Sequence, residues 1–243
     1  MSNPKQEKFS HTIEIIVVIL MGLTALLTAW ASWVGSLHSG NQATNYTVSN
    51  NIASEGNSEY NAASQYLMQD MILWNEIADM QFDIWYAYEN DDEYTLALQS
   101  EKLYFKLYEN LSDDMAAAIA WDFPESDDYV TTILDWMENE EAVNTPFADE
   151  EYFDSYYEYA YELLAESDAV LEQGKEDNAN GDKFGLITVI FSVSLFLLGM
   201  ISTMESVKNK YILLGVAGVS IVFATIFMLC IPLPTGFSLA NFF

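Results

Sequence analysis

The sequence predicts an all-α protein with three transmembrane helices and an acidic extracytoplasmic helical bundle inserted between the first and second of them. Three observations lead to this class. The chain has three long apolar runs, its acidic residues are concentrated between the first two runs, and apolar residues in that region recur at helical spacing. No stretch shows the alternation of apolar and polar residues that is typical of paired strands.

The three apolar runs cover residues 13–34, 184–204 and 211–231. At about 1.5 Å per residue, each run is long enough to cross a hydrocarbon core about 30 Å thick. The first run contains one charged residue, Glu14 at its start, and the other two contain none. A core helix of a globular protein is the alternative for any single run, but three runs of this length favour a multi-pass membrane protein.

Lysine placement predicts the orientation of the helices, because cytoplasmic loops are enriched in basic residues. Lys5 and Lys8 precede the first run, and Lys208 and Lys210 lie between the second and third runs. We therefore expect a protein of the cell membrane with a cytoplasmic N-terminus and turn and an extracytoplasmic domain and tail, at residues 1–12, 205–210, 35–183 and 232–243 respectively.

A cleaved signal peptide is the alternative for the first run. Ala29, Trp30 and Ala31 fit the small-x-small pattern of a signal-peptidase site. The apolar stretch before them is about 18 residues long, whereas signal peptides have an apolar core of about 7–15 residues. The length therefore favours a retained membrane helix.

The charge of the chain excludes one class of partner. The sequence has 37 acidic and 8 basic residues, a net charge of −29, and residues 35–183 hold 34 of the acids but only four lysines. Such a chain repels phosphate backbones, so we expect no nucleic-acid partner. The acids are expected to form a solvated surface that keeps the outer domain soluble and weakly concentrates cations.

The outer domain carries the pattern of several helices. The first is predicted from an apolar face with steps of three and four residues. Its members are Ala63, Leu67, Met71, Trp74, Ile77, Gln81, Ile84 and Tyr88. The run breaks at residues 89–93, and a second helix is predicted over 93–110.

Further start and stop signals divide the rest of the domain. Ser112 and Ser126 each have the form of a helix N-cap followed by acidic residues, and Pro146 begins the next break. A long final helix is then predicted from about Asp149 to the second membrane run. Its tyrosines and phenylalanine favour core and groove packing over a ligand-stacking surface.

Small residues form a stripe on the first membrane helix. Gly22, Ala25, Ala29, Ser32 and Ser36 are spaced by three and four residues, which places them on one face. In lipid, small residues mark places where helix backbones approach closely. The stripe predicts packing within one protomer or self-association into a homo-oligomer, and Gly215 and Gly218 give a weaker version of the same signal in the third helix.

The segment "EDNANGDKFGLI" (176–187) has the first half of an EF-hand pattern. Its twelfth position, which should be a bidentate acid, is Ile187, and its first position is Glu176 where Asp is expected. We therefore reject a calcium loop. A weak surface cation site at Asp177 and Asp182 is the alternative left open.

We find no pattern for catalysis, a metal or a cofactor. His11 and His38 are predicted on opposite sides of the membrane, and the single Cys230 can form neither an intrachain disulfide nor a cysteine zinc cluster. The sequence therefore predicts no enzyme. Asn45 and Asn110 match the glycosylation acceptor pattern, and both lie in the predicted outer domain.

Three stretches resemble an uncharacterised family of small prokaryotic three-helix membrane proteins. They are "LTALLTAWASWVGSLHSGNQATNYTVSN" (23–50), "NTPFADEEY" (144–152) and "NANGDKFGLITVIFSVSLFLLGM" (178–200), which together cover about a quarter of the chain. The resemblance implies three membrane helices with a helical extracytoplasmic insertion between the first two. It implies no activity and no functional residues.

Two hypotheses of function follow. The first is a non-enzymatic membrane protein whose outer domain serves for binding, sensing or scaffolding, with a lipid bilayer and an unknown envelope ligand or protein as partners. Gln42, Asn45 and residues 178–182 would line its junction with the membrane. The second is an oligomeric cation-selective channel with an acidic outer vestibule and a pore lined by Thr24, Thr28 and Ser32. A hydrolase built from carboxylates alone is a third and weaker reading.

Overall fold

The computed structural model describes residues 4–237, and the side chains of residues 11–237. Every regular element in this range is helical and the range contains no strand, which confirms the predicted all-α class. Residues 1–3 of the predicted N-terminal segment, residues 238–243 of the predicted tail and the side chains of Lys5 and Lys8 lie outside the described residues.

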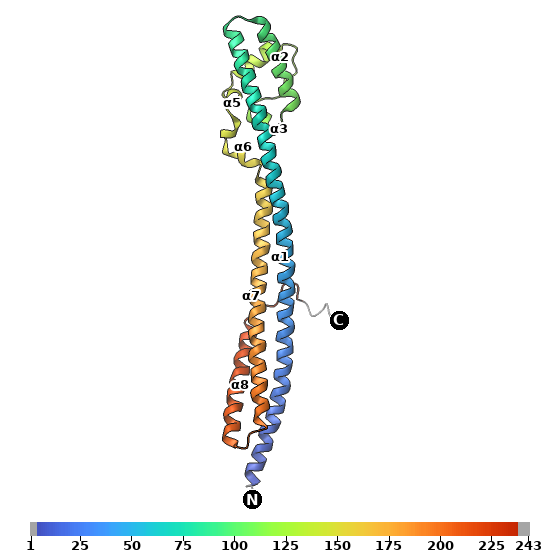
Figure 1. The fold of residues 1–243 in the computed structure, drawn as a ribbon, viewed down its shortest axis with the longest axis vertical. Helices are drawn as coiled ribbons and strands as arrows, with labels where there is room; N and C mark the ends of the chain where they lie inside the picture. Colours follow the sequence, from blue (N-terminus) through green and yellow to red (C-terminus); the bar gives the residue numbers. More distant parts are fainter. Residues whose placement is uncertain (1–3, 238–243) are drawn as a thin grey trace. The chain divides into compact units, whose positions relative to one another are not determined.

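The chain divides into two compact units, each described here by itself. The terminal unit is the described part of residues 1–50 and 167–243, and the central unit is residues 51–166. In chain order the elements are α1 (Pro4–Glu89), α2 (Glu93–Asn110), α3 (Asp113–Ala118), α4 (Tyr129–Met137), α5 (Glu140–Val143), the 3₁₀ helix η1 (Pro146–Ala148), α6 (Glu150–Ser155), α7 (Glu158–Ile201) and α8 (Val207–Leu229) (Figure 1). Helices α1 and α7 contribute residues to both units.

Three helices, α1, α7 and α8, are long and apolar enough to cross a membrane. The helices do not end where the apolar runs end. The run at 13–34 is one part of the 86-residue α1, which begins at Pro4, and no other proline occurs before Pro124 to interrupt it. Helix α7 ends at Ile201 and α8 begins at Val207, so the turn lies at residues 202–206 and not at the predicted 205–210.

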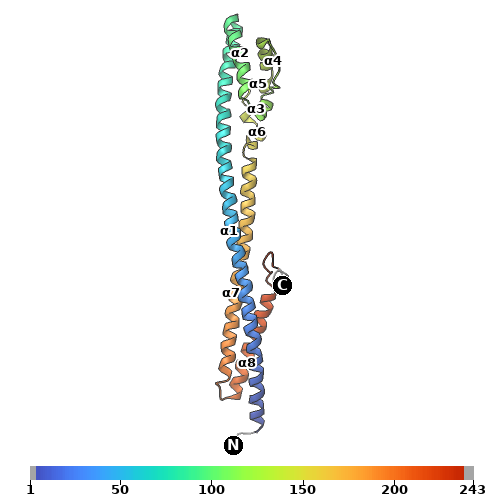
Figure 2. The same ribbon diagram turned by 90° about the vertical axis from the view of Figure 1, so that its right-hand side faces the viewer.

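The core of the terminal unit is formed by α1, α7 and α8, and Figures 1 and 2 both show α8 alongside α7. Ala31 and Val34 of α1 pack with Phe184 and Phe191 of α7 in this core. Gly35 marks the closest approach, because a Cβ atom at this position would lie 3.1 Å from the Cβ of Phe184. Small residues at such a crossing let two backbones approach, as is common between helices in lipid.

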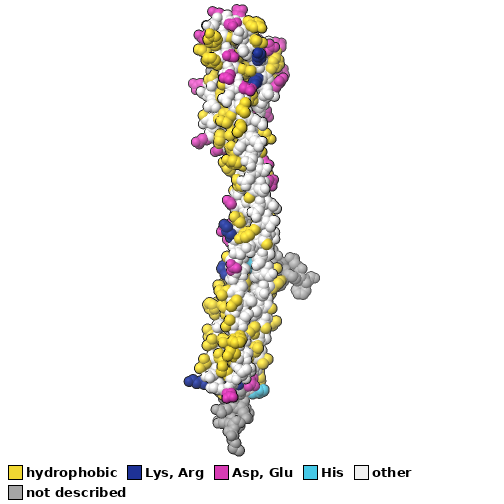
Figure 3. All heavy atoms as spheres, in the orientation of Figure 1, with side chains coloured by type: hydrophobic (Ala, Val, Ile, Leu, Met, Phe, Trp, Pro, Cys, Tyr) yellow, Lys and Arg dark blue, Asp and Glu magenta, His cyan; other side chains and the backbone are white. Residues whose placement is uncertain are grey.

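The core of the central unit is aromatic. Trp74 of α1, Tyr104 of α2, Trp136 of α4 and Tyr152 of α6 are all buried in one cluster. Gln81, the one polar residue in the predicted apolar face, is also buried and donates a hydrogen bond from its Nε2 to the Ala142 carbonyl at 2.6 Å. The face of this unit that Figure 3 shows carries many acidic side chains.

The predicted apolar face of α1 is correct in six of its eight members. Met71 and Tyr88 are instead 43% and 55% exposed. The buried positions Leu67, Trp74 and Gln81 recur every seven residues, so the packed seam is narrower than the face of an isolated amphipathic helix. Met71 falls outside this seam, and Tyr88 lies at the end of the helix.

Two predicted helix boundaries are confirmed by their caps. Helix α1 ends at Glu89, the first residue of the predicted break at 89–93, and Asp92 caps α2 by accepting a hydrogen bond from the Thr95 amide at 3.1 Å. Ser112 caps α3 by accepting from the Met115 amide at 3.1 Å. Short polar side chains in these positions satisfy the free N–H groups of the first helical turn.

Two other boundaries were predicted wrongly. The N-cap of α4 is Asp128, whose carboxylate accepts from the Thr131 amide, and the hydroxyl of Ser126 instead accepts from the Asp128 amide. The final helix does not run unbroken from Asp149. Asp149 caps the short α6, which ends at Ser155, and α7 begins at Glu158.

Candidate functional site

A buried polar cluster lies in the terminal unit and consists of His38, Asn45, Asp177 and the carbonyl of Pro232. Helix α1 carries His38 and α7 carries Asp177, and both side chains are only 2% exposed. The His38 Nδ1 lies 2.8 Å from Asp177 Oδ1, and the His38 Nε2 lies 3.1 Å from the Pro232 oxygen. Asn45 Nδ2 donates to the other carboxylate oxygen at 3.2 Å.

The protons of this His38 cluster follow from its hydrogen bonds. A carbonyl can only accept, so the Nε2 that faces Pro232 carries a proton. A second proton must lie between Nδ1 and the Asp177 oxygen, because two lone pairs 2.8 Å apart would repel each other. The two side chains therefore share one proton along the Nδ1–Oδ1 contact, and Nε2 donates to the Pro232 carbonyl.

The cluster and the neighbouring Asn41 also form hydrogen bonds with the segment that follows α8. His38 holds the carbonyl of Pro232, and Asn41 Nδ2 donates to the carbonyl and hydroxyl oxygens of Thr235 at 3.1 and 3.2 Å. The ring of Phe184 stacks on the imidazole with centroids 5.7 Å apart. Sequence reasoning missed this site, although His38 comes seven residues after the buried Ala31 and continues the same buried spacing.

The structure does not bring together the two residues of the predicted weak cation site. Asp177 is buried and already engaged by His38 and Asn45, whereas Asp182 is exposed. Five residues along a helix turn a side chain to a different face, since each residue advances about 100°. Among the described side chains, no group of three or more His, Cys, Asp or Glu residues is placed to hold a metal ion.

The small-residue stripe of α1 points away from the neighbouring helices of the terminal unit. Its five members, Gly22, Ala25, Ala29, Ser32 and Ser36, are all exposed. The packed face instead carries Ala31, Val34 and Gly35, none of which belongs to the stripe. In the third helix, Cβ atoms at Gly215 and Gly218 would meet nothing within 4 Å. Packing within the protomer therefore does not explain the stripe.

The residues expected to line a pore do not share one surface. Thr24 is fully buried and its hydroxyl donates to the Leu20 carbonyl at 2.7 Å. Thr28 is half-buried and donates to the Thr24 carbonyl, while Ser32 is exposed. One protomer therefore does not present the predicted hydroxyl line toward a common channel.

The residues predicted at the membrane junction and as glycosylation acceptors also lie in different environments. Gln42 is half-buried, Asn45 belongs to the His38 cluster, and residues 178–182 are half-buried or exposed. Both glycosylation acceptors have their amide hydrogen-bonded: the half-buried Asn45 donates to Asp177, and Asn110, exposed at the end of α2, donates to the Lys106 carbonyl at 3.1 Å.

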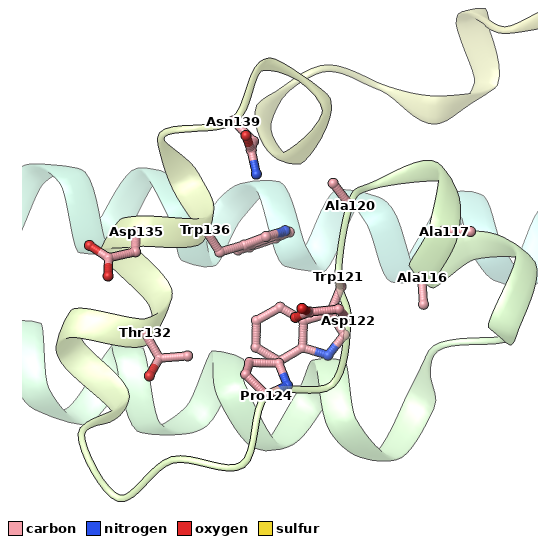
Figure 4. A pocket seen from close by; sticks show the side chains of 10 residues that line it. All are labelled: Ala116, Ala117, Ala120, Trp121, Asp122, Pro124, Thr132, Asp135, Trp136 and Asn139. Atoms are coloured by element: carbon pink, nitrogen blue, oxygen red, sulfur yellow. The ribbon is translucent and has the colours of Figure 1, made fainter.

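A pocket of about 620 Å³ lies in the central unit between the end of α3, the connection at residues 119–128, and α4. Figure 4 shows Trp121 and Asp122 on the connection and Thr132, Asp135 and Trp136 on α4. The full lining is Ala116, Ala117, Ala120, Trp121, Asp122, Pro124, Thr132, Asp135, Trp136 and Asn139.

Two left-handed residues shape the connection that walls this pocket. Ala120 has φ 52° where α3 ends, and the Trp121 amide donates back to the Ala116 carbonyl at 2.8 Å. Phe123 has φ 53° directly before Pro124, whose carbonyl accepts from the Tyr104 hydroxyl at 2.6 Å. Residues other than glycine adopt this backbone region at a cost of about 1–2 kcal/mol. Such strain concentrates at functional sites, so the connection is a candidate site by geometry.

The two indoles of the pocket differ in their hydrogen bonds. Trp136 Nε1 donates to the Ile119 carbonyl at 2.8 Å. Trp121 Nε1 is buried and has no hydrogen-bond partner within the described part of the chain. The two rings meet edge to face with centroids 5.5 Å apart. An unpaired buried N–H costs about 1–3 kcal/mol, which makes Trp121 an unexplained feature of the packing.

A tyrosine pair elsewhere in the central unit has perturbed ionisation. The Tyr152 and Tyr156 hydroxyls lie 2.6 Å apart, and Tyr156 donates to Asp70. Burial, followed by the hydrogen bond to Asp70, raises the pKa of Tyr156 far above its usual value, and burial also raises the pKa of Tyr152. The pair therefore stays protonated and serves packing.

Fold and site together define a class, an all-α protein with three helices apt to cross a membrane and a separate acidic helical unit that contains an aromatic pocket. Comparisons with protein-family models, with curated proteins and with solved structures find no match to this chain.

Proposed function

We propose that the chain is a non-enzymatic integral protein of the cell membrane whose acidic helical region binds a ligand on the extracytoplasmic side, for sensing or scaffolding at the envelope. The observation that carries the proposal is the pocket of the central unit, whose 620 Å³ lies within the range of about 300–1,000 Å³ of small-molecule sites. Its lining offers indoles, carboxylates and amides, and none of the ten lining residues is a His, Cys or Lys.

Two observations support the proposed orientation. The acids lie between the first two candidate spans, and Lys208 and Lys210 follow the second span. Lys210 Nζ lies 3.5 Å from the Glu14 carboxylate, so the start of the first span and the 202–206 turn are on the same side of the terminal unit. This is the arrangement that a cytoplasmic N-terminus and a cytoplasmic turn require.

Cysteine labelling tests the orientation. In a Cys230→Ser background, Glu101→Cys and Lys208→Cys each introduce one exposed thiol. A membrane-impermeant maleimide should label the thiol at position 101 in intact cells and the thiol at position 208 only after the cells are opened. The reverse pattern would overturn the proposed topology.

A pocket-filling variant tests the binding role. Ala117→Trp places a large ring in the pocket from an exposed position on α3, and Ala97→Trp is its control on an exposed position of α2 away from the lining. Thermal unfolding of the full-length protein in detergent is measured with a panel of small cations, anions and neutral compounds. We expect at least one compound to stabilise the native protein and the Ala97→Trp variant, but not Ala117→Trp. Binding by no compound, or equal binding by all three proteins, would remove the pocket as the ligand site.

Self-association is a second part of the proposal, because the five small residues of the stripe on α1 are exposed in the protomer. We propose that a second copy covers this stripe in the membrane. The oligomeric state of the detergent-extracted protein, compared between the native chain and Gly22→Leu, tests it.

A further inference from the structure

We infer that the pocket of the central unit selects a compact organic cation that also carries a hydrogen-bond acceptor, such as a quaternary or primary ammonium with a hydroxyl or carbonyl group. This inference rests on the proposed function, since it names the ligand class of the same pocket. Three independent features lead to it: the charge of the rim, the aromatic walls and the unpaired indole.

The rim of the pocket is negative. Asp122 and Asp135 both line it and are exposed, and neither forms an ion pair within residues 11–237. The central unit has 29 acidic residues and only two lysines, and one of these, Lys106, is paired with Glu76. An anionic ligand would be repelled, whereas a cation would be attracted both by the field of the unit and by the two carboxylates.

Two of the ten residues that line the pocket are aromatic. Trp121 and Trp136, which are 3% and 5% exposed, contribute two indoles set at 81° to each other. Indole is the aromatic ring that attracts cations most strongly, and quaternary ammonium groups are recognised by such rings because they cannot donate strong hydrogen bonds. Carboxylates combined with indoles favour a bulky, weakly hydrated organic cation over a small metal ion, which would need several oxygen ligands.

The acceptor requirement comes from Trp121. Its N–H is buried and unpaired in the described structure, while the N–H of Trp136 is satisfied by the Ile119 carbonyl. Trp121 lies on the strained connection between the left-handed Ala120 and Phe123. A small shift of this connection on binding would let an oxygen of the ligand accept from Trp121 and would relieve the unpaired group.

Calorimetry on the full-length protein in detergent tests the ligand class with a matched pair of probes. Choline carries a quaternary ammonium and a hydroxyl, and 3,3-dimethylbutan-1-ol has the same shape without the charge. We expect saturable binding of choline and binding of the neutral isostere that is about tenfold weaker or undetectable. Tetramethylammonium, which lacks the hydroxyl, should bind more weakly than choline.

Paired variants separate contact with the pocket from the general attraction of an acidic surface. Asp122→Asn with Asp135→Asn removes two charges from the lining, and Glu125→Gln with Glu138→Gln removes two exposed charges close by in sequence but outside the lining. The first pair should weaken choline binding about fivefold, and the second pair should change it little. Circular dichroism and the melting temperature show whether each variant is folded.

The outcomes distinguish this inference from the proposed function. Equal binding of choline and its neutral isostere, equal effects of the two variant pairs, or no binding of any organic cation would each overturn the cation class. If an anion or a neutral compound bound instead and Ala117→Trp blocked it, the proposed function would stand while the inference failed. Choline binding that Ala117→Trp left intact would overturn both.

Discussion

The two units of this chain are both helical, yet they pack by different means. In the terminal unit, backbones approach at Gly35 and large aliphatic side chains point outward, with Leu26, Val219 and Leu229 at least 71% exposed. In the central unit, large aromatic side chains fill the interior, and many acidic side chains lie among exposed apolar ones on the face seen in Figure 3. Contiguous exposed aliphatic side chains are unfavourable in water but not in lipid. The difference therefore indicates that the surface of the terminal unit suits lipid and the surface of the central unit suits water.

The two units also treat buried polar groups differently. In the terminal unit, the buried side chains of His38 and Asp177 join α1 to α7. Ser49 and Ser167 join the same helices, since each hydroxyl donates to the backbone carbonyl of the other residue at 2.9 Å. In the central unit, the indole of Trp136 and the amide of Gln81 donate to backbone carbonyls, and the half-buried Tyr156 hydroxyl donates to Asp70. The buried carboxylate of the terminal unit should therefore contribute more to stability than the other bonds, and the following variants test this.

Removing the buried carboxylate should have the largest effect. Asp177→Ala leaves the buried His38 without its carboxylate partner and should lower the free energy of unfolding by about 3–5 kcal/mol. The measurement is denaturant unfolding in detergent micelles, and the control is Asp182→Ala, an exposed acid on the same helix. Equal effects of the two variants would show that the His38 cluster does not stabilise the terminal unit.

The next largest effect is expected from a bulky side chain at Gly35, where α1 and α7 approach each other most closely. Gly35→Leu must displace Phe184, whose Cβ lies 3.1 Å from the position of a new Cβ, and should cost about 1–3 kcal/mol of unfolding free energy. Gly40→Leu is the matched control on the same helix, because a Cβ there meets nothing within 4 Å. Gly40→Leu should leave protomer stability unchanged. If both substitutions cost the same, close packing at Gly35 would not distinguish this unit.

The tyrosine pair of the central unit predicts loss of stability at alkaline pH. The pKa of Tyr156 in the folded protein lies above the ordinary phenol value of 10.0, so the folded protein keeps this proton at a pH where a free tyrosine loses it. As the pH rises past about 10, the unfolded chain releases a proton that the folded chain retains, so the free energy of unfolding falls. Tyr156→Phe should make this fall shallower and cost about 1 kcal/mol at neutral pH through the lost hydrogen bond to Asp70. Urea unfolding between pH 8 and 11 checks the slope, and the exposed Tyr159→Phe should not alter it.

Much of the fold could be predicted because it depends on local or periodic signals. Apolar length indicated the three candidate spans, and the cap at Ser112 and the break after Glu89 depend only on nearby residues. The errors arose where a partner element decides the outcome. The apolar residues of α1 predict a wide buried face. The elements that pack against α1 decide which of these residues are buried, and Met71 is not among them.

The sites were less predictable for the same reason. The pairing of His38 with Asp177 joins residues 139 positions apart, and the spacing of small residues along α1 does not indicate which face meets α7. A polar residue at a buried seven-residue spacing was the one available signal for His38. The pocket depends on the left-handed backbone at Ala120 and Phe123, and neither residue type favours that conformation, so no local pattern predicts it.

The smallest predicted effect is a gain in stability at the pocket. Ala120 occupies the left-handed position that ends α3, where glycine is the usual residue. Ala120→Gly removes a backbone cost of about 1–2 kcal/mol but adds entropy to the unfolded chain worth about 0.5–1 kcal/mol. The free energy of unfolding should therefore rise by about 0.5–1 kcal/mol, whereas Ala97→Gly, inside α2, should lower it by a similar amount. Destabilisation by both substitutions would show that the backbone at Ala120 is not strained. Backbone strain would then no longer support a ligand site at this pocket.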